Sequence, residues 1–504
     1  MTTAITAPND PRPPFGPDHL ATLAHAHSRR WWILGVLGLA QLMVVLDATI
    51  VNIALPSAQH ALGFSTADRQ WVVTAYSLAF GSLLLLGGRL SDFLGRKRMF
   101  LIGVVGFGIA SAVGGFSTGF IMLIIARGAQ GAFGAMLAPA ALSLLTTTFS
   151  DTSERGKAFG IYGAIAGAGG AVGLLLGGVL TEYLDWRWCL YVNCAFAVIA
   201  VIGGALLLSN QARATDVRFD IPGTITAILA LVGIVYGFSE ADTKGWTSPL
   251  TLGFIAAGVI LLAVFVLIER RSSHPLLPLR VITHRTRGAS YLAIGFAGIG
   301  VFGVFLFLTY FLQDQLGYSP VRTGLAFLPM VAALMVASIL STSKVLPRYG
   351  PKLAVAPGML IAAVGMVLLT RITLQASYLT VIVPALVLLG FGIGLVFGTA
   401  MNIGTAGATE ADAGVASAMI NTSQQIGGSI GTALLNSLAA SATATYLLHR
   451  TSSTLSRNHA ALHGDIVVFT VAAAILAAGA LVAAVVYPNG KVAVDSDVEP
   501  IPVS

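Results

Sequence analysis

Long apolar runs recur along nearly the whole chain, and short polar segments separate them. Each run is about 20 residues long, which is the length an α-helix needs to cross a lipid bilayer. The pattern therefore predicts an all-α integral membrane protein with fourteen transmembrane helices. The predicted spans are 31–53, 70–88, 99–117, 119–146, 158–181, 188–208, 222–239, 249–268, 288–312, 320–342, 352–371, 378–401, 414–437 and 465–487.

Composition agrees with this pattern. Of the 504 residues, 56% are hydrophobic and 10% are charged, which is too apolar for a soluble multidomain protein. A net charge of +7 could indicate a nucleic-acid partner. Nucleic-acid binding requires basic residues gathered on a soluble face, however, and here they occupy short loops between apolar runs. We therefore expect a lipid bilayer and no nucleic acid as the surroundings of this chain.

The basic residues also predict the topology, because cytoplasmic loops of membrane proteins are enriched in lysine and arginine. Alternate loops carry Arg89, Arg96, Lys97, Arg98, Arg155, Lys157, Arg213, Arg218, Arg270, Arg271, Arg280, Arg285, Arg287, Lys344, Arg348 and Lys352. Both termini are then cytoplasmic, and the protein is predicted to lie in the cell (plasma) membrane. The loop 401–413 does not fit, since it has Glu410 and Asp412 but no basic residue.

The two ends of the chain are polar. Residues 1–30 are rich in proline and are predicted to be a disordered cytoplasmic tail, and residues 488–504 a second cytoplasmic tail. The sequence 28–31 loosely resembles a twin-arginine export signal. We favour a membrane helix, because the apolar stretch that follows is long enough to span and further spans come after it.

Asp47 is the acidic residue that lies deepest in an apolar run. An aspartate at the centre of a span costs about 2.5 to 3.5 kcal/mol on insertion scales, so it predicts a functional site that faces a water-filled cavity. Arg127 is its candidate partner. At 1.5 Å per residue, Asp47 lies about 24 Å from Trp31 and Arg127 about 12 Å from the outer end of its helix, so both are in the outer half of the bilayer. Alternatively, Arg127 binds backbone carbonyls and extends outward.

The segment Leu46–Pro56 resembles the first-helix signature of the drug:proton antiporter family with fourteen spanning helices, a branch of the major facilitator superfamily. The resemblance implies a major facilitator fold: six-helix bundles at 31–208 and 288–487, with two linker helices inserted at 222–268. A loop repeat, 88–97 and 343–352, supports this grouping. The second copy lacks the aspartate, and any tight cytoplasmic turn tends to be basic and to contain glycine.

Two motifs in the first bundle strengthen the resemblance. The loop after the second span resembles the superfamily's loop motif, which implies that it holds the bundles together as a conformational latch. The latch residues are Gly88, Asp92, Gly95, Arg96 and Arg98. The segment Ile125–Gly131 resembles the family's arginine motif, and its spacing places Arg127 and Gln130 on one helical face.

The fifth predicted helix is dense in glycine and resembles the antiporter signature of proton-coupled exporters. The glycines of the motif are Gly163, Gly167, Gly173, Gly177 and Gly178. Leu174 stands where this signature has proline, so the kink that proline causes is in question. Small residues at this spacing let helices approach closely, and such packing is the alternative interpretation.

The resemblance implies a proton-driven exporter of drugs, antibiotics or other secondary metabolites. No GxxxxGK[ST] sequence for ATP binding occurs, and we predict no enzyme activity, no cofactor and no metal site. Proton coupling would depend on Asp47, which takes up and releases the proton, and on Arg127 as its charged partner. A small lipophilic substrate, cationic or neutral, would bind to a monomer. Candidate cavity residues are Gln41, Tyr76, Gln130, Tyr310, Asn421 and Gln424. A proton-coupled importer on the same fold, or a membrane sensor or enzyme, are the alternatives.

Overall fold

A computed structural model describes residues 17–66, 68–149, 152–209, 220–273, 275–406, 410–448 and 453–490. All regular secondary structure within these residues is helical. The predicted tail from 491 onward, the predicted tail before Pro17 and the predicted cytoplasmic residues Arg213 and Arg218 lie outside the described residues.

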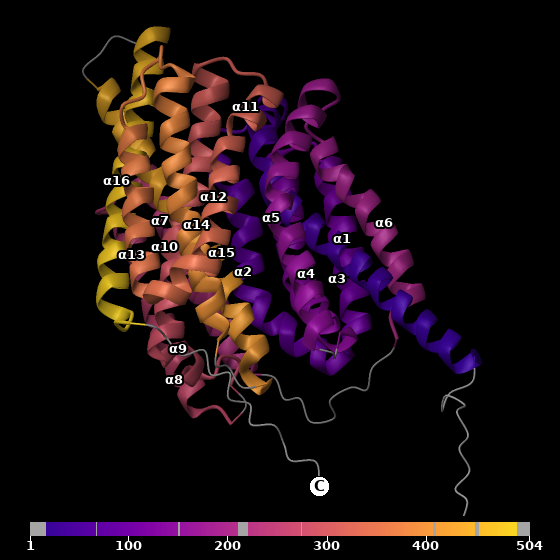
Figure 1. Cartoon of the computed structure of the whole chain (residues 1–504). Coiled ribbons are helices and arrows are strands. Elements are labelled where there is room, and N and C mark those ends of the chain that lie inside the picture. Colours follow the sequence, from indigo (N-terminus) through magenta and orange to yellow (C-terminus); the bar gives the residue numbers. More distant parts are fainter. Residues whose placement is uncertain are drawn as a thin grey trace, which may run out of the picture.

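The N-terminal half consists of six long helices that pack on one another. They are α1 (Pro17–Leu62), α2 (Arg69–Leu94), α3 (Arg96–Gly115), α4 (Phe120–Thr148), α5 (Thr152–Tyr183) and α6 (Trp188–Leu207). Helix α4 packs against α2 and α3, while α1 packs against α5 and α6. Figure 1 shows these helices in indigo to magenta on one side of the molecule.

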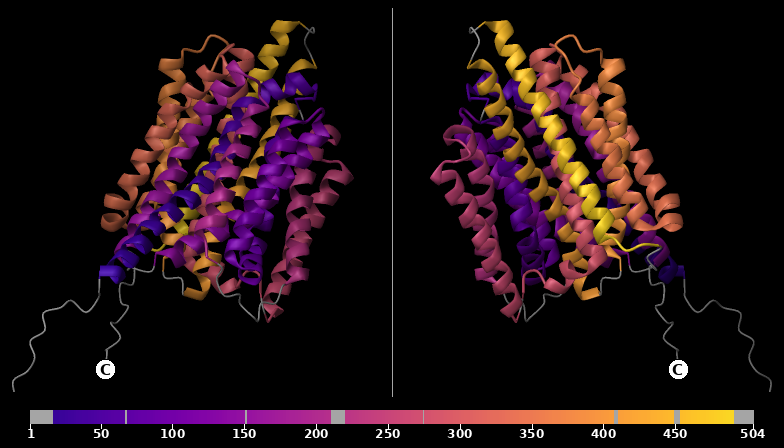
Figure 2. Two further views of the ribbon diagram at one scale, coloured as in Figure 1. Left: turned by 90° about the vertical axis from the view of Figure 1, so that its right-hand side faces the viewer. Right: turned by 90° about the vertical axis from the view of Figure 1, so that its left-hand side faces the viewer.

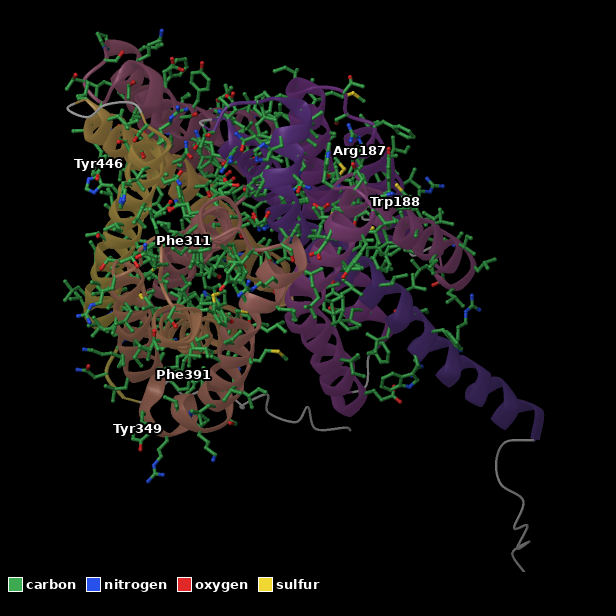
Figure 3. The ribbon with its side chains drawn as sticks, turned by 90° about the horizontal axis from the view of Figure 1, so that it is seen from above. Arg187, Trp188, Phe311, Tyr349, Phe391 and Tyr446 are labelled. Carbon is green, nitrogen blue, oxygen red and sulfur yellow. The ribbon has the colours of Figure 1, made fainter. Side chains whose placement is uncertain are left out.

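The C-terminal half repeats this arrangement with shorter helical pieces. It contains α10 (Arg285–Tyr310) and η1 (Phe311–Gln315), α11 (Pro320–Ala326), α12 (Leu328–Leu340) and η2 (Ser341–Val345), α13 (Leu346–Leu369), η3 (Tyr378–Ile382) and α14 (Val383–Thr405), α15 (Glu410–Leu447) and α16 (Thr454–Val486). Helix α14 packs against α12 and α13, and α10 packs against α15 and α16. Seen from above, the two halves lie side by side, with Arg187 and Trp188 on one and Tyr349 and Tyr446 on the other (Figure 3).

The helices are long and apolar enough to span a membrane. Among the described residues, eleven helical stretches meet this requirement. One of them, 320–369, makes two passes, because Gly350, near the start of α13, has a φ of 80° and breaks the helix there. Helices α5 and α15 are also long enough to cross. Each of the fourteen predicted spans therefore coincides with a helical segment, and the protein is an all-α, multi-pass membrane protein.

Three further helices connect the halves: α7 (Ile221–Lys244), α8 (Pro249–Arg271) and the short α9 (Leu279–Thr283). Helix α7 packs on α8, on α15 of the C-terminal half and on α2 of the N-terminal half. The inserted pair therefore lies beside the seam where α2 meets α15, and it forms one edge of the molecule (Figure 2). On the other side of the seam, α11 packs on α5.

We call the top of the molecule in Figure 1 its upper end and the opposite side its lower end. Helix α1 begins and α16 ends at the lower end. Two predicted boundaries are wrong. Helix α1 already begins at Pro17, so 17–30 is helical, because proline suits the first turn and the alanines and leucines that follow favour a helix. Helix α16 begins at Thr454, where Ser453 caps it by accepting a hydrogen bond from the Ser456 amide.

The two loop copies share one backbone feature. Gly95 joins α2 to α3 with a φ of 93°, and Gly350, at the corresponding position of the second copy, has a φ of 80°. Only glycine adopts such angles without strain. The glycine that recurs in the loop repeat is therefore required by the same tight turn in both halves.

Candidate functional site

An ion pair lies in the interior of the N-terminal half. Asp47 on α1 accepts a hydrogen bond at 2.6 Å from the guanidinium of Arg127 on α4. Asp47 is 0% exposed and Arg127 is 1% exposed. The structure thus brings together the two charged residues that the sequence places at one depth, although helical stretches separate them along the chain.

Uncharged polar side chains complete the coordination of Asp47. The Gln130 amide on α4 and the Asn193 amide on α6 donate to Asp47 Oδ1 at 2.9 Å and 2.8 Å. Gln130 also contacts Ser111 Oγ on α3 at 2.7 Å, and its Oε1 accepts from Arg127 at 2.8 Å. Three helices, α1, α4 and α6, therefore meet at one carboxylate, and Gln130 links α3 to it. Each additional donor stabilises the charged form of the carboxylate.

The arginine is held just as firmly as the carboxylate. Arg127 Nε donates to the Val72 carbonyl at 3.1 Å, and the guanidinium lies 4.5 Å from the ring centroid of Tyr76, both on α2. A cation over an aromatic face gains most when water is excluded. In this arrangement Arg127 has partners on three sides. If Asp47 alone were lost, the remaining partners would still stabilise part of the positive charge of Arg127.

Glycines allow the backbones around this site to come close. A side chain at Gly131 would collide with the Tyr76 carbonyl, and one at Gly173 or Gly177 would collide with Thr49 or Ile50 on α1. Close packing of α4 on α2 and of α5 on α1 therefore depends on these glycines. Gly178 instead faces Val321 of α11 and belongs to the contact between the halves.

A small apolar cavity of about 10 Å³ adjoins Arg127. Its walls come from α1, α2, α4 and the start of α6. They include Val51, Ala54, Leu55, Ala58, Val72, Leu123, Trp186, Cys189 and Leu190. A cavity of this size accommodates about one water molecule.

A second ion pair joins the two halves at the upper end. Arg69 at the start of α2 donates to Asp314 of η1 at 2.8 Å, and its guanidinium lies 4.0 Å from the Tyr310 ring centroid. Two other bonds cross the same seam. The Gln313 amide donates to the Ile53 carbonyl at 3.1 Å, and Glu182 accepts from the Val321 amide at 2.9 Å.

The structure divides the six candidate cavity residues into separate groups. Tyr76 and Gln130 are buried in the Asp47 cluster, and Tyr310 is buried beneath Arg69, so these three bridge helices. Gln41 is partly buried and accepts a hydrogen bond from the Tyr162 hydroxyl at 2.8 Å. Gln424 is partly buried as well, while Asn421 is exposed on α15.

The residues of the loop motif lie at the lower end. Gly88 has space around it, Gly95 makes the turn, and Arg98 is exposed. Arg96 is partly buried. Neighbouring Lys97 donates to the Ala205 and Leu208 carbonyls at the end of α6. The surroundings of the Asp92 side chain lie outside what the structure describes, as do the surroundings of Gly163 and Gly167 in the fifth-helix motif.

Sequence reasoning missed three polar residues that the structure places in these clusters. Asn193 and Ser111 are fully buried beside Asp47, and Asp465 on α16 is 7% exposed near Asp314. Asn193 is a strongly polar residue inside an apolar span, a signal that could have identified it. Ser111 gave no such signal, because serine is common in membrane helices as a packing residue.

Comparison with known proteins agrees with this architecture. Residues 37–432 match the family model described as Major Facilitator Superfamily. The chain is 49% identical over 469 residues to the "Puromycin resistance protein pur8" of Streptomyces alboniger, covering 93% of each chain. It is 37% identical to the "Cephamycin export protein CmcT" of Amycolatopsis lactamdurans, covering 80% of this chain and 84% of that one.

Solved structures share the fold at much lower identity. An "auto inhibited POT family peptide transporter" superposes with a TM-score of 0.66 and 15% identity, covering 94% of this chain and 99% of that one. A "Bacterial Homolog to Human Lysosomal Transporter, Spinster" gives a TM-score of 0.61 at 17% identity, covering 90% and 97%. At this identity the likeness concerns the fold alone.

Proposed function

Because this chain belongs to the Major Facilitator Superfamily, we propose that it is a proton-coupled exporter of small lipophilic antibiotics or related secondary metabolites. It is a transporter rather than an enzyme. The observation that carries the proposal of proton coupling is the fully buried pair of Asp47 and Arg127 in the N-terminal half. The resistance and export proteins to which the chain is similar support the direction of transport and the class of substrate.

The upper end of the molecule faces the cell exterior in this proposal, and both termini are cytoplasmic. Basic side chains support this orientation, because Lys97 and Arg98 lie in the first turn of α3 and Arg285 begins α10, both at the lower end. Bonds across the seam at the upper end, among them Arg69 to Asp314, then hold the exterior side closed. The structure corresponds in this view to a state that opens toward the cytoplasm.

Proton binding at Asp47 requires the ion pair to rearrange. A carboxylate beside an arginine stays charged, whereas a buried carboxylate without that partner favours its neutral form. When α1 and α4 shift, Arg127 keeps the Val72 carbonyl and Gln130 Oε1 as partners, and Asp47 takes a proton from the exterior. Return to the closed arrangement restores the pair and releases the proton to the cytoplasm.

The substrate binds between the halves, in a cavity to which Gln41, Asn421 and Gln424 contribute. Asp47 is enclosed by α1, α4 and α6, so it influences the substrate through helix movement rather than by contact. This favours recognition by shape, apolar surface and hydrogen bonds for either a neutral or a cationic substrate. One chain contains both halves, so a monomer is sufficient for alternating access.

The test is substrate uptake into inverted membrane vesicles whose interior is acidified. Puromycin is the first probe, because of the similar resistance protein. We expect uptake by the wild type, loss of uptake when an ionophore collapses the pH gradient, and no uptake by Asp47→Asn. Asp185→Asn is the matched control, since Asp185 is a half-exposed carboxylate paired with Arg187 at the surface of the same half.

The outcomes separate the candidate functions. Uptake by Asp47→Asn at the wild-type rate would exclude Asp47 as the coupling residue while leaving export intact. Accumulation that occurs only in right-side-out vesicles with an acidic exterior would identify an importer instead. If no preparation takes up puromycin, the same assay is repeated with cephamycin. Uptake of cephamycin would indicate a narrow substrate range, and its absence would argue against export.

A further inference from the structure

A second carboxylate lies behind the ion pair that closes the upper end. Asp465 on α16 is 7% exposed, and its Oδ2 accepts a hydrogen bond from the Gln315 amide at 2.8 Å. Gln315 directly follows Asp314, the partner of Arg69. Gln315 therefore places Asp465 beside the ion pair, and we call Arg69, Asp314 and Asp465 the seam cluster.

The charges of this cluster do not balance. Arg69 is a single cation and is 6% exposed, while Asp314 and Asp465 are two carboxylates. Arg69 is already paired with Asp314, and Gln59 and the Tyr310 ring occupy its other sides. A buried carboxylate without a counter-ion is costly, and Asp465 avoids this cost by taking up a proton.

Polar atoms without partners support a proton at this place. Tyr310 is 7% exposed, and its hydroxyl has no hydrogen-bond partner among the described residues. Gln315 Oε1, on the side chain that donates to Asp465, also lacks a partner within the described part of the chain. A protonated Asp465 adds a donor next to the Gln315 side chain, whose Oε1 lacks one.

Other titratable and charged groups near Asp465 are turned to the surface or engaged elsewhere. His463 on α16 is exposed and its ring lies 5.3 Å from that of Tyr446 on α15. Arg322 on α11 stacks on Tyr318 at 3.8 Å. Further residues of this kind at the upper end of the packed helices, all exposed, are Arg371, Arg457 and His459.

We propose that Asp465 takes up a proton from the exterior when the two halves close at the upper end, so that external acidity favours closure. When the halves separate, water enters and hydrates the Asp465 carboxylate, which favours its charged form, and the proton returns to the exterior. No net proton crosses the membrane by this route. The external pH instead sets how readily the empty exporter closes, in addition to the coupling at Asp47.

The inference rests on the proposed function for the orientation of the upper end only. It is tested by the distance between spin labels on cysteines placed at Leu184, which directly follows α5, and at Leu379 in η3, which precedes α14; both residues are exposed. Cys189 and Cys194 are replaced by alanine. The purified full chain in lipid nanodiscs needs neither substrate nor a gradient, so the measurement is valid whether or not export is detected.

Linkage gives the expected size of the effect. One proton bound on closure changes the closed-to-open ratio by up to tenfold per pH unit, with more closed protein at acidic pH. Asp465→Asn should remove this dependence and stay closed at alkaline pH, because the amide carries no charge. Asp465→Glu should restore the pH dependence, and the matched control His463→Gln should keep it.

Asp47→Asn separates this proposal from the proposed function. If the closed-to-open ratio still depends on pH in Asp47→Asn and no longer does so in the double variant Asp47→Asn/Asp465→Asn, that pH dependence arises from Asp465. The proposal is overturned if Asp465→Asn keeps the full wild-type pH dependence, or if it opens the upper end instead of closing it. Monodisperse elution and unchanged helix content establish that each variant folds.

Discussion

Two ion pairs within the described residues, one inside the N-terminal half and one at the seam, have the same chemistry but opposite settings. Asp47 and Arg127 belong to one half, and their side chains are 0% and 2% exposed. Arg69 and Asp314 belong to different halves, with side-chain exposures of 8% and 31%. The first pair can separate only if packed helices of one half shift. The second separates whenever the halves move apart.

This difference assigns separate tasks to the pairs. A fully desolvated pair is costly to disrupt by removing one partner, so it preserves a defined arrangement of α1, α4 and α6. A partly exposed pair contributes little to stability because water replaces its partner. We infer that the inner pair defines the proton-binding state and the seam pair defines which state of the cycle is populated.

The largest effect is expected for Arg127→Ala. The change leaves Asp47 buried without its counter-ion, which costs about 3 to 5 kcal/mol of stability. Thermal unfolding in detergent should show a large drop in the midpoint, and vesicle uptake should be lost. Arg187→Ala, which removes a partly exposed arginine from its pair with Asp185, should unfold within a few degrees of the wild type.

A glycine pair provides the next contrast. Gly173→Val pushes a side chain into Thr49 next to the inner site, whereas Gly178→Val pushes into Val321 across the seam. Overpacking a fixed contact costs about 1 to 3 kcal/mol. We therefore expect Gly173→Val to lower thermal stability and Gly178→Val to leave it nearer the wild type while opening the upper end. Equal losses of stability in both variants would mean that the seam is as rigid as the interior of one half.

Asn193→Leu should have a smaller effect on the inner site. It removes one donor to Asp47 Oδ1 but also removes an amide oxygen that has no partner among the described residues. The free energy of unfolding should fall by about 1 kcal/mol, because Arg127 and Gln130 remain as donors to Asp47. A chemical denaturation series measures the loss. A destabilisation as large as that of Arg127→Ala would show that the amide is essential for burying the carboxylate.

The sequence predicted the inner pair better than the seam. Asp47 and Arg127 are charged residues inside apolar runs, so their depth along two helices was enough to match them. Arg69 and Asp465 stand near predicted span ends, where charged residues are normally solvated. Their burial arises from helices of both halves and from a longer α16, which no local pattern reports. The helical fold followed from hydrophobic run length, while the contacts across the seam required tertiary structure.

The smallest effect on stability, and the sharpest test of the comparison, is expected for Asp314→Asn. Because the pair with Arg69 is partly exposed, its loss should change stability by only about 0.2 to 1 kcal/mol. The closed population should nevertheless fall, since Arg69 loses its anionic partner in the other half. Spin-label distances between Leu184 and Leu379 measure this population, and a thermal scan measures stability on the same sample. If Asp314→Asn unfolds at a clearly lower temperature but its upper end stays closed, the roles assigned to the inner pair and the seam pair are reversed.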